Sequence, residues 1–251
     1  MKALQILERE IVSCRSCPRL VTWREQVARE KRAAFRDAEY WGKPVPGFGD
    51  PKARLLIVGL APAAHGGNRT GRVFTGDRSG DWLFGALHRA GFANQPTSTH
   101  RDDGLRLTDA YIAACVRCAP PDNKPTPQER DRCLPYLVRE LRLLRNVRVL
   151  LCLGAFAWAG ALAALAELGA SVKPRPVFGH AATSQVGPYM LVGSYHPSQQ
   201  NTFTGRLTQV MLDSVLGQCR ALVRGDAVSP VRSMPRASFR PATCDQAERD
   251  G

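Results

Sequence analysis

Residues 55–60 read LLIVGL, and residues 61–77 continue as APAAHGGNRTGRVFTGD. The first stretch is a continuous apolar run that reaches a glycine near its end, which is typical of a strand buried on both faces of a parallel sheet. The second contains four glycines and one proline, so its backbone can approach a ligand closely. Functional residues of parallel sheets lie beyond the carboxyl ends of the strands, so we expect a site in this loop.

Apolar strands and helix patterns alternate along the rest of the chain. Strands are expected at 110–116, 147–153, 177–186 and 189–194, and helices at 82–90, 126–145, 155–168 and 203–223. The second of these helices has the strongest start signals, with Thr126 as N-cap, Pro127 at the first helical position and Glu129 completing a capping box. This alternation predicts an α/β fold, a three-layer α/β/α sandwich with a central, mostly parallel sheet of four to five strands.

The first 50 residues precede the first buried strand. Amphipathic segments at 3–12 and 19–35 flank Cys14 and Cys17, and residues 40–51 are rich in glycine and proline and predict a loop. We expect one folded domain over 1–225 that includes this N-terminal helical segment. Residues 226–251 have scattered Ser, Pro and Arg without a period and predict a disordered tail.

Composition excludes several classes of protein. The 251 residues carry a net charge of +13 and are 44% hydrophobic, which rules out disorder of the whole chain. No run of about 20 apolar residues predicts a membrane span, and the acidic start does not resemble a signal peptide. Eight cysteines are too dilute for a secreted disulfide scaffold. We expect a cytoplasmic protein with reduced thiols, whose excess positive charge indicates a polyanion partner, most often nucleic acid.

Two C-x-x-C pairs stand out among the cysteines. They are Cys14 with Cys17 and Cys115 with Cys118, and Cys133 lies in the helix that follows the second pair. Such a pair can share one metal centre, either Zn²⁺ or an iron–sulfur cluster, while a redox dithiol is a weaker alternative. Strand alternation places Cys115 and Cys118 on opposite faces, so both need not be ligands. Cys152 lies in an expected strand and Cys219 in an expected helix. Both are expected to be buried as small hydrophobic residues.

The segment 194–207 reads SYHPSQQNTFTGRL and joins the last strand to the last helix. Pro197 holds the preceding His196 in an extended conformation, next to hydrogen-bonding side chains. In the loop at 61–77, Phe74 and Asp77 are unusual residues for a flexible loop unless they have a functional role. Phe74 could instead plug onto the core, and Asp77 could cap the helix that follows. The loop lacks the G-K-[ST] of a Walker motif.

Together these segments resemble the uracil-DNA glycosylase superfamily. GLAPAAHG…RVFTGD is similar to its first motif and HPSQQN…TGRL to its second. The cysteine set resembles that of the iron–sulfur branches, and RCAPPDNKP at 117–125 resembles family 5, the UDGb type. The resemblance covers about residues 10–223. It implies a [4Fe–4S] cluster rather than zinc, held by four ligands: Cys14, Cys17, Cys118 and Cys133.

The chain departs from the sister branches at two positions. Those branches carry an acid or Asn shortly after the first glycine of motif one, where this chain has Leu60 and Ala61. They also carry a uracil-reading Asn where this chain has Ala114. A site without that hydrogen bond cannot reject analogues strongly. We therefore expect a monofunctional glycosylase acting on uracil and on other deaminated or damaged bases, such as hypoxanthine or modified uracils.

The resemblance also implies roles for individual residues. A base must be flipped out of the duplex to be reached, and Phe74 would stack on it. Asp77, the one carboxylate of residues 61–77, would orient water and stabilise the sugar cation, and His196 would hydrogen-bond the departing base. The remaining expectations fall into two sets. The base would also contact Ala61, Asn123 and Asn201. The DNA would contact Arg69, Arg72, Ser198, Gln199, Gln200 and Arg206.

Two other functions remain open at this point. A non-catalytic iron–sulfur DNA-binding protein would explain the charge and the cysteines, but it would leave Phe74, Asp77 and His196 without a role. A strict uracil enzyme similar to family 4 would be expected to keep the polar residues that Leu60 and Ala114 replace. The expected partner is DNA containing uracil or other deaminated bases. We expect the protein to be a monomer that does not bind a membrane. In a prokaryote it would be associated with the nucleoid.

Overall fold

The computed structural model describes residues 2–225 of the chain. The expected disordered tail, 226–251, lies outside the described residues. Six strands form one sheet in the order β1-β3-β2-β4-β6-β5. Their bounds are β1 Phe48–Gly49, β2 Leu55–Gly59, β3 Ala110–Ala114, β4 Val149–Leu153, β5 Thr183–Val186 and β6 Tyr189–Ser194. The four central strands run parallel, and each edge strand is antiparallel to its neighbour.

The prediction of an α/β sandwich with a mostly parallel sheet is confirmed, but the strand number of four to five is wrong. The additional strand, β1, has two residues and lies in the segment predicted as a loop, where Phe48 pairs with Ile112 of β3. Two residues give no alternation of polar and apolar side chains, so this strand leaves no pattern in the sequence.

Strand β2 is buried along its whole length, as its apolar run predicts. Leu55 and Ile57 belong to one core cluster, and Leu56 and Val58 belong to a second cluster on the other face of the sheet. Alternate residues of a strand point to opposite faces, so a strand covered on both sides must be apolar at every position.

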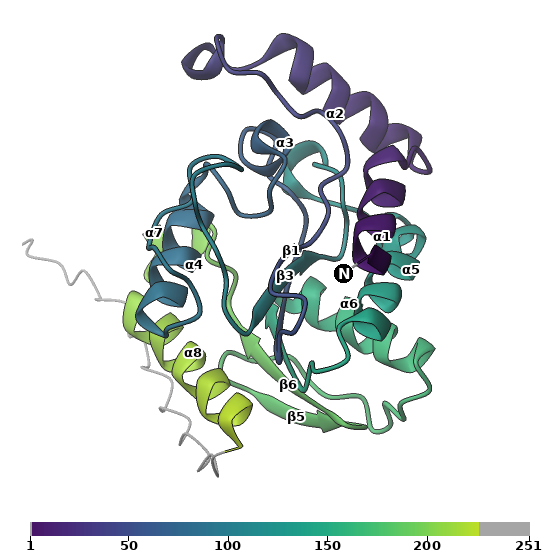
Figure 1. Cartoon of the computed structure of the whole chain (residues 1–251), viewed down its shortest axis with the longest axis vertical. Coiled ribbons are helices and arrows are strands. Elements are labelled where there is room, and N and C mark those ends of the chain that lie inside the picture. Colours follow the sequence, from purple (N-terminus) through teal and green to yellow (C-terminus); the bar gives the residue numbers. More distant parts are fainter. Residues whose placement is uncertain (1, 226–251) are drawn as a thin grey trace, which may run out of the picture.

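Helices cover both faces of the sheet (Figure 1). The main helices are α1 Lys2–Ser13, α2 Pro18–Glu30, α4 Arg78–Arg89, α5 Pro127–Leu143, α6 Ala155–Glu167 and α8 Gln209–Arg224, and the short ones are α3 Gly67–Thr70 and α7 Gln199–Phe203. Helices α4 and α8 pack in the first core cluster, and α1, α5 and α6 pack in the second. Helix α2 lies beyond the sheet edge and contacts α3. None of the helices in residues 2–225 is both long and apolar enough to span a membrane.

The capping box predicted for α5 is present. Thr126 Oγ1 accepts from the Glu129 N–H at 3.2 Å, and Glu129 Oε2 accepts from the Thr126 N–H at 2.8 Å. The single last helix expected over 203–223 is wrong. Gly205 adopts a φ of +69° and Thr208 caps a new helix, so α7 and α8 are separate.

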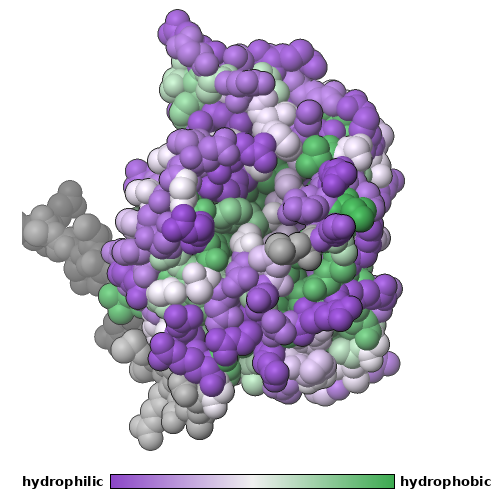
Figure 2. Space-filling view, viewed as in Figure 1, coloured by the Kyte–Doolittle hydropathy of each residue, from purple (hydrophilic) through white to green (hydrophobic). Residues whose placement is uncertain are grey.

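The helix expected over 19–35 also ends early. Helix α2 stops at Glu30 because Lys31 adopts a φ of +54°, and a single 3₁₀ turn follows at Ala33–Phe35. The charged residues of this segment other than Arg24 are at least partly exposed. Figure 2 shows hydrophilic side chains over most of the face that it draws, broken by small apolar patches.

Candidate active site

The loops after β2 and β6 meet at the carboxyl edge of the sheet. Both strands run parallel to β4, which lies between them, so their carboxyl ends point to the same edge. The rings of Phe74 and His196 face one another there, with centroids 5.8 Å apart and planes inclined by 35°. The structure thus brings together the two aromatic side chains that the sequence singled out on separate motifs.

Phe74 is fixed in an uncommon conformation. Its φ is +52°, a region that non-glycine residues rarely adopt, and its side chain is 8% exposed. A Cβ on Gly59 would lie 2.7 Å from the Phe74 ring, so the glycine at the end of β2 makes room for it. Phe74 belongs to the first core cluster, so it does plug onto the core while its ring also faces His196.

Asp77 caps α4, as one of the two alternatives for this residue predicts. Its Oδ1 accepts from the Gly80 N–H at 3.0 Å, at the positive end of the helix dipole. Its other oxygen lies against Gly66, where an added Cβ would approach to 2.0 Å. Burial raises the pKa of Asp77, while the N–H groups of Gly80 and Ser79 oppose that rise. Capping uses one oxygen, and the second remains beside the glycine-rich loop.

His196 is partly exposed and lies against apolar neighbours. Its Cβ is 3.6 Å from the position of a Cβ on Gly154, at the end of β4. Burial lowers the pKa of His196 to about 4, so its ring is neutral at about pH 7. A neutral imidazole carries one N–H, which can donate a hydrogen bond to a carbonyl oxygen.

Asn201 holds the loop of His196 in place. Its Nδ2 donates to the main-chain oxygen of His196 at 2.9 Å. This bond gives one N–H of the amide a positioning role, and the contact of its remaining polar atoms with a base stays a prediction. Gln199 and Gln200 next to it are exposed on α7, and Ser198 precedes them as the N-cap. These three side chains form an accessible rim beside His196, and their contact with DNA stays a prediction.

Arg206 also lies on this rim. Its side chain is exposed, and its guanidinium carbon lies 4.7 Å from the centre of the Tyr195 ring. Its position is compatible with the predicted phosphate contact, since Tyr195 directly precedes His196.

Arg72 has a different role from the one expected. It is 4% exposed and donates to Asp103 Oδ2 at 2.7 Å and to Ser98 Oγ at 2.8 Å. Burial acts to raise the pKa of Asp103, but the hydrogen bonds from Arg72 and from the N–H groups of Leu105 and Thr99 lower it to about 2. The prediction that Arg72 contacts DNA phosphate is wrong, because its guanidinium is buried in an internal ion pair.

Arg69 likewise serves the loop itself. Its Nε donates to the His65 carbonyl at 2.8 Å and its Nη2 to the Gly76 carbonyl at 3.0 Å. Its guanidinium carbon also lies 4.1 Å from the centre of the Phe35 ring. These contacts close the loop that carries Phe74, and because their acceptors are neutral carbonyls, the phosphate contact of Arg69 stays a prediction.

The two other residues expected at the base lie elsewhere on the same edge. Ala61 packs against the cluster formed by Cys17, Cys118 and Cys133. Asn123 is exposed in a single 3₁₀ turn, Pro121–Asn123, and its φ is +55°. Neither has a hydrogen bond or ring contact with Phe74 or His196 among the described residues, so their contact with a base stays a prediction.

The cysteine set separates as alternation predicts. Cys115 lies in the second core cluster, and its Sγ is 2.4 Å from the position of a Cβ on Gly160 in α6. Cys118 lies instead with Cys17 and Cys133 in a third buried cluster. We call this group, together with the partly exposed Cys14, the cysteine cluster.

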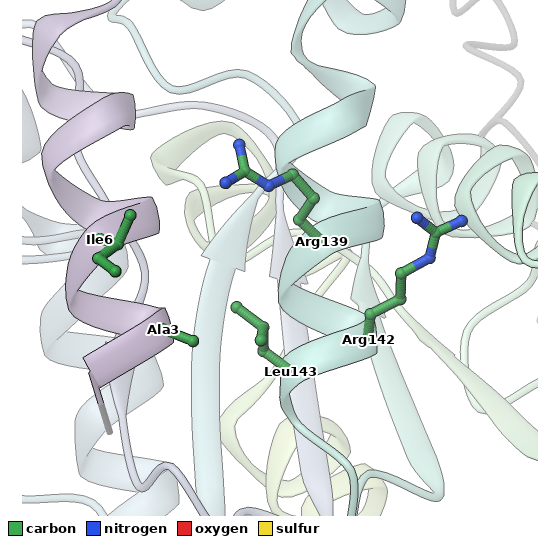
Figure 3. A pocket seen from close by; sticks show the side chains of 5 residues that line it. All are labelled: Ala3, Ile6, Arg139, Arg142 and Leu143. Carbon is green, nitrogen blue, oxygen red and sulfur yellow. The ribbon is translucent and has the colours of Figure 1, made fainter.

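A surface hollow of about 250 Å³ lies away from these loops, between α1 and α5. Figure 3 shows Ala3 and Leu143 facing each other across it, with Ile6, Arg139 and Arg142 around them. Neither motif loop contributes a side chain, so this hollow is not part of the candidate site.

Sequence reasoning missed the polar network that fixes the loop of Phe74. Thr75 and Ser98 join Arg72 and Asp103, and the Thr75 and Ser98 hydroxyls lie 2.7 Å apart. The four residues share no motif, because the contacts join the loop to a segment more than 20 positions further along. Arg72 and Thr75 belong to RVFTGD, which the sequence had singled out, whereas Ser98 and Asp103 belong to no such stretch.

A family model described as the uracil DNA glycosylase superfamily matches residues 46–218, which include both motif loops. The chain belongs to this superfamily. Uracil-DNA glycosylases are hydrolases acting on N-glycosyl bonds. A Type-5 uracil-DNA glycosylase of Mycobacterium tuberculosis is 57% identical over 83% of this chain and 78% of the relative. One of Thermus thermophilus is 52% identical over 84% of this chain and 94% of the relative.

A Type-4 uracil-DNA glycosylase of Archaeoglobus fulgidus is also similar, at 34% identity over 62% of each chain. Within the uracil-DNA glycosylase superfamily, the chain is thus more similar to these Type-5 relatives than to that Type-4 one, in agreement with the family 5 resemblance of its motifs.

Proposed function

We propose that this chain is a monofunctional DNA glycosylase that hydrolyses the N-glycosidic bond of uracil in DNA, as a step of base excision repair. The observation that carries this proposal is the pair of Phe74 and His196, whose rings lie 5.8 Å apart at the carboxyl edge of the sheet. The Type-5 names of the relatives support it. A purely DNA-binding protein has no need for an aromatic residue at positive φ beside a neutral histidine.

The first step is extrusion of the target nucleotide from the duplex, which costs a few kcal/mol and least for a mispaired base. Phe74 would stack on the flipped base. Because Phe74 is already buried and its backbone is held at positive φ, its side chain loses little conformational freedom on binding. The exposed side chains of Gln199 and Gln200 would contact the duplex at the place that the base leaves.

Bond cleavage then places positive charge on the sugar and negative charge on the leaving base. The neutral His196 ring would donate its N–H to the carbonyl oxygen of the base, where that negative charge develops. Asp77 would use the oxygen that does not cap α4 to orient the water that adds to the sugar carbon and to stabilise the cation there.

We also propose a substrate range wider than uracil, including hypoxanthine. Ala114 pairs in register with Gly59 at the end of the two strands below the site, and its side chain is a buried methyl group. A methyl group forms no hydrogen bond to a base edge, so it imposes no strong penalty on a base with other polar groups. A strict family 4-like uracil enzyme is the alternative.

The test is a single-turnover assay of abasic-site formation in duplexes containing one uracil or one hypoxanthine. The proposal predicts cleavage of uracil, and it predicts cleavage of hypoxanthine at a lower or similar rate. Cleavage of uracil alone would support the strict alternative. DNA binding without cleavage of either would support a non-catalytic protein. We expect the active form to be a monomer in the cytoplasm at the nucleoid. Light scattering with and without DNA would test whether the protein is a monomer.

We further propose that the cysteine cluster holds a [4Fe–4S] cluster. Its four thiols come from three separate segments of the chain, and thiolates are the ligands that iron–sulfur clusters use. Burial raises the pKa of Cys118 to about 12 and that of Cys133 to about 11, so both are protonated thiols without a metal. Metal binding would release these protons.

Hydrogen-bond donors surround the sulfur atoms. Arg24 Nη1 donates to Cys118 Sγ at 2.9 Å. The Cys14 thiol donates to Ser16 Oγ at 3.4 Å, and that hydroxyl would donate to a Cys14 thiolate instead. Burial raises the pKa of Cys17, and a hydrogen bond from Arg132 opposes that rise. Donors of this kind stabilise thiolates and tune cluster potentials. The donor set therefore fits the group.

Within residues 2–225, no three His, Cys, Asp or Glu side chains are close enough to hold a single metal ion. A cubane distributes its ligands over four irons, so it accepts thiols that stand further apart than the ligands of one ion. Bound there, the cluster would join α2 to α5 and to the loop after β3. Iron and sulfide content with visible absorbance would support the proposal, and stoichiometric zinc without iron would refute it.

A further inference from the structure

Arg24, on α2, is the most enclosed cation of the N-terminal segment. Its side chain is 2% exposed. Nη1 donates to Cys118 Sγ at 2.9 Å, and Nη2 donates to the main-chain oxygen of Cys14 at 3.2 Å. Its Nε has no hydrogen-bond partner within residues 2–225. The guanidinium is thus directed at two of the four proposed ligand residues.

No buried carboxylate balances this charge among the described residues. The nearest is Glu25, whose Oε1 lies 3.8 Å from Arg24 Nη2 and whose side chain is 32% exposed. Glu25 already receives both terminal nitrogens of Arg15. Burying an arginine costs free energy unless an anion pairs with it, and a neutral thiol is not an anion.

The structure assigns Arg24 as the internal counter-charge of the iron–sulfur cluster. This inference rests on the cluster proposed above. Four thiolates around a [4Fe–4S] core carry net negative charge in a buried place, and the guanidinium would neutralise part of it through Cys118. Arg24 is therefore a positioning residue for the cofactor, and we expect the cluster to be lost more readily without its charge.

Three substitutions separate charge from packing and hydrogen bonding. Arg24→Met keeps the length and removes the charge, Arg24→Lys keeps the charge without the planar fork, and Arg24→Gln keeps an N–H donor without the charge. Asn68 donates to the main-chain oxygen of Arg24, so side-chain substitution leaves this link to α3 in place. Arg29→Met is the matched control, since Arg29 is an exposed residue of the same helix.

The measurement is the rate at which purified holoprotein loses its visible absorbance and iron to an excess of an iron chelator. We expect Arg24→Met to speed this loss by about tenfold or more, the size expected for a hydrogen bond to a charged group. Arg24→Lys should stay within about threefold of the unmodified protein, Arg24→Gln should resemble Arg24→Met, and Arg29→Met should be unchanged.

Two results would overturn the inference: a loss rate for Arg24→Met equal to that of the unmodified protein, or a cluster retained as well in Arg24→Gln as in Arg24→Lys. If Arg24→Met does not fold, the comparison of Lys with Gln still decides, because packing and hydrogen bonding alone would not favour Lys. An unmodified protein without iron or sulfide would refute the cluster itself, whereas an iron-replete one with unaffected variants refutes only the role of Arg24.

Discussion

The ring of His196 lies 5.8 Å from that of Phe74, and the two planes are inclined by 35°. This contact joins the loop after β2 to the loop after β6. Burial in these surroundings lowers the pKa of His196 to about 4, below the value of about 6.5 for an exposed histidine. The neutral form is therefore the one that fits the folded site.

A pH dependence of stability follows from this shift. Between about pH 6.5 and pH 4 the unfolded chain binds a proton at His196 that the folded chain does not. The stabilising contribution is fully present above about pH 6.5 and is lost as the pH falls through about 4. We expect His196→Gln to reduce the loss of unfolding free energy over this range, measured by urea unfolding at several pH values.

The other titratable groups are common to both proteins, so the difference between the two curves isolates His196. Parallel curves would show that His196 is not neutralised by folding.

Gly66 should be essential to the position of Asp77. A methyl group there would meet the Asp77 carboxylate at 2.0 Å, so Gly66→Ala must displace that side chain or the loop. We expect the single-turnover rate on a uracil duplex to fall by at least about tenfold, as for a misplaced catalytic group.

Gly217 provides the matched control, since an added Cβ there meets no atom of the described residues within 4 Å. Gly217→Ala lies in α8 and should leave the rate unchanged while stabilising the fold by about 0.5–1 kcal/mol. Equal rates for Gly66→Ala and Gly217→Ala would mean that the Asp77 carboxylate is not needed where it stands.

Arg72 and Arg206 should respond to substitution in opposite ways. Arg72→Met leaves Asp103 buried without its partner and should cost about 3–5 kcal/mol of unfolding free energy. Arg206→Ala should leave stability unchanged, weaken DNA binding, and reduce the slope of log affinity against log salt by about 0.9. Denaturant unfolding and binding titrations at several salt concentrations measure both. An unaltered salt slope would remove Arg206 from the DNA interface.

The two cysteines of the second C-x-x-C should differ in their effect on the cluster. Cys115 packs between sheet and α6, so Cys115→Ala should retain iron and the visible absorbance. Cys118→Ala removes a proposed ligand and leaves Arg24 without its sulfur partner, so iron should be lost and stability should fall. Iron content that is lost equally in both variants would contradict the proposed ligand set.

The sequence was sufficient for features that depend on neighbours along the chain. The buried run of β2, the capping box of Thr126 and the opposite directions of Cys115 and Cys118 follow from local periodicity and were confirmed. The fate of Arg72 was not predictable in this way, because its partner Asp103 is 31 residues away. A basic residue in a glycine-rich loop resembles a phosphate contact until such a partner is known.

The same limit applies to the short elements. Strand β1 has two residues, and the break between α7 and α8 depends on Gly205 and the Thr208 cap within an otherwise helical stretch. Arg24 was also missed, since an arginine on an amphipathic helix gives no sign that it is buried until α2 is placed against the cysteines. Long-range packing, rather than local propensity, decides these positions.

Asp77→Asn tests whether Asp77 and the Phe74–His196 pair form the centre of a uracil-excising site. Asn caps a helix about as well as Asp and keeps the oxygen bound to the Gly80 N–H, so the fold and DNA affinity should be unchanged. The single-turnover rate of abasic-site formation in a uracil duplex should fall by about 10²–10⁴. A rate equal to that of the unmodified protein would show that Asp77 is only a helix cap with no part in cleavage.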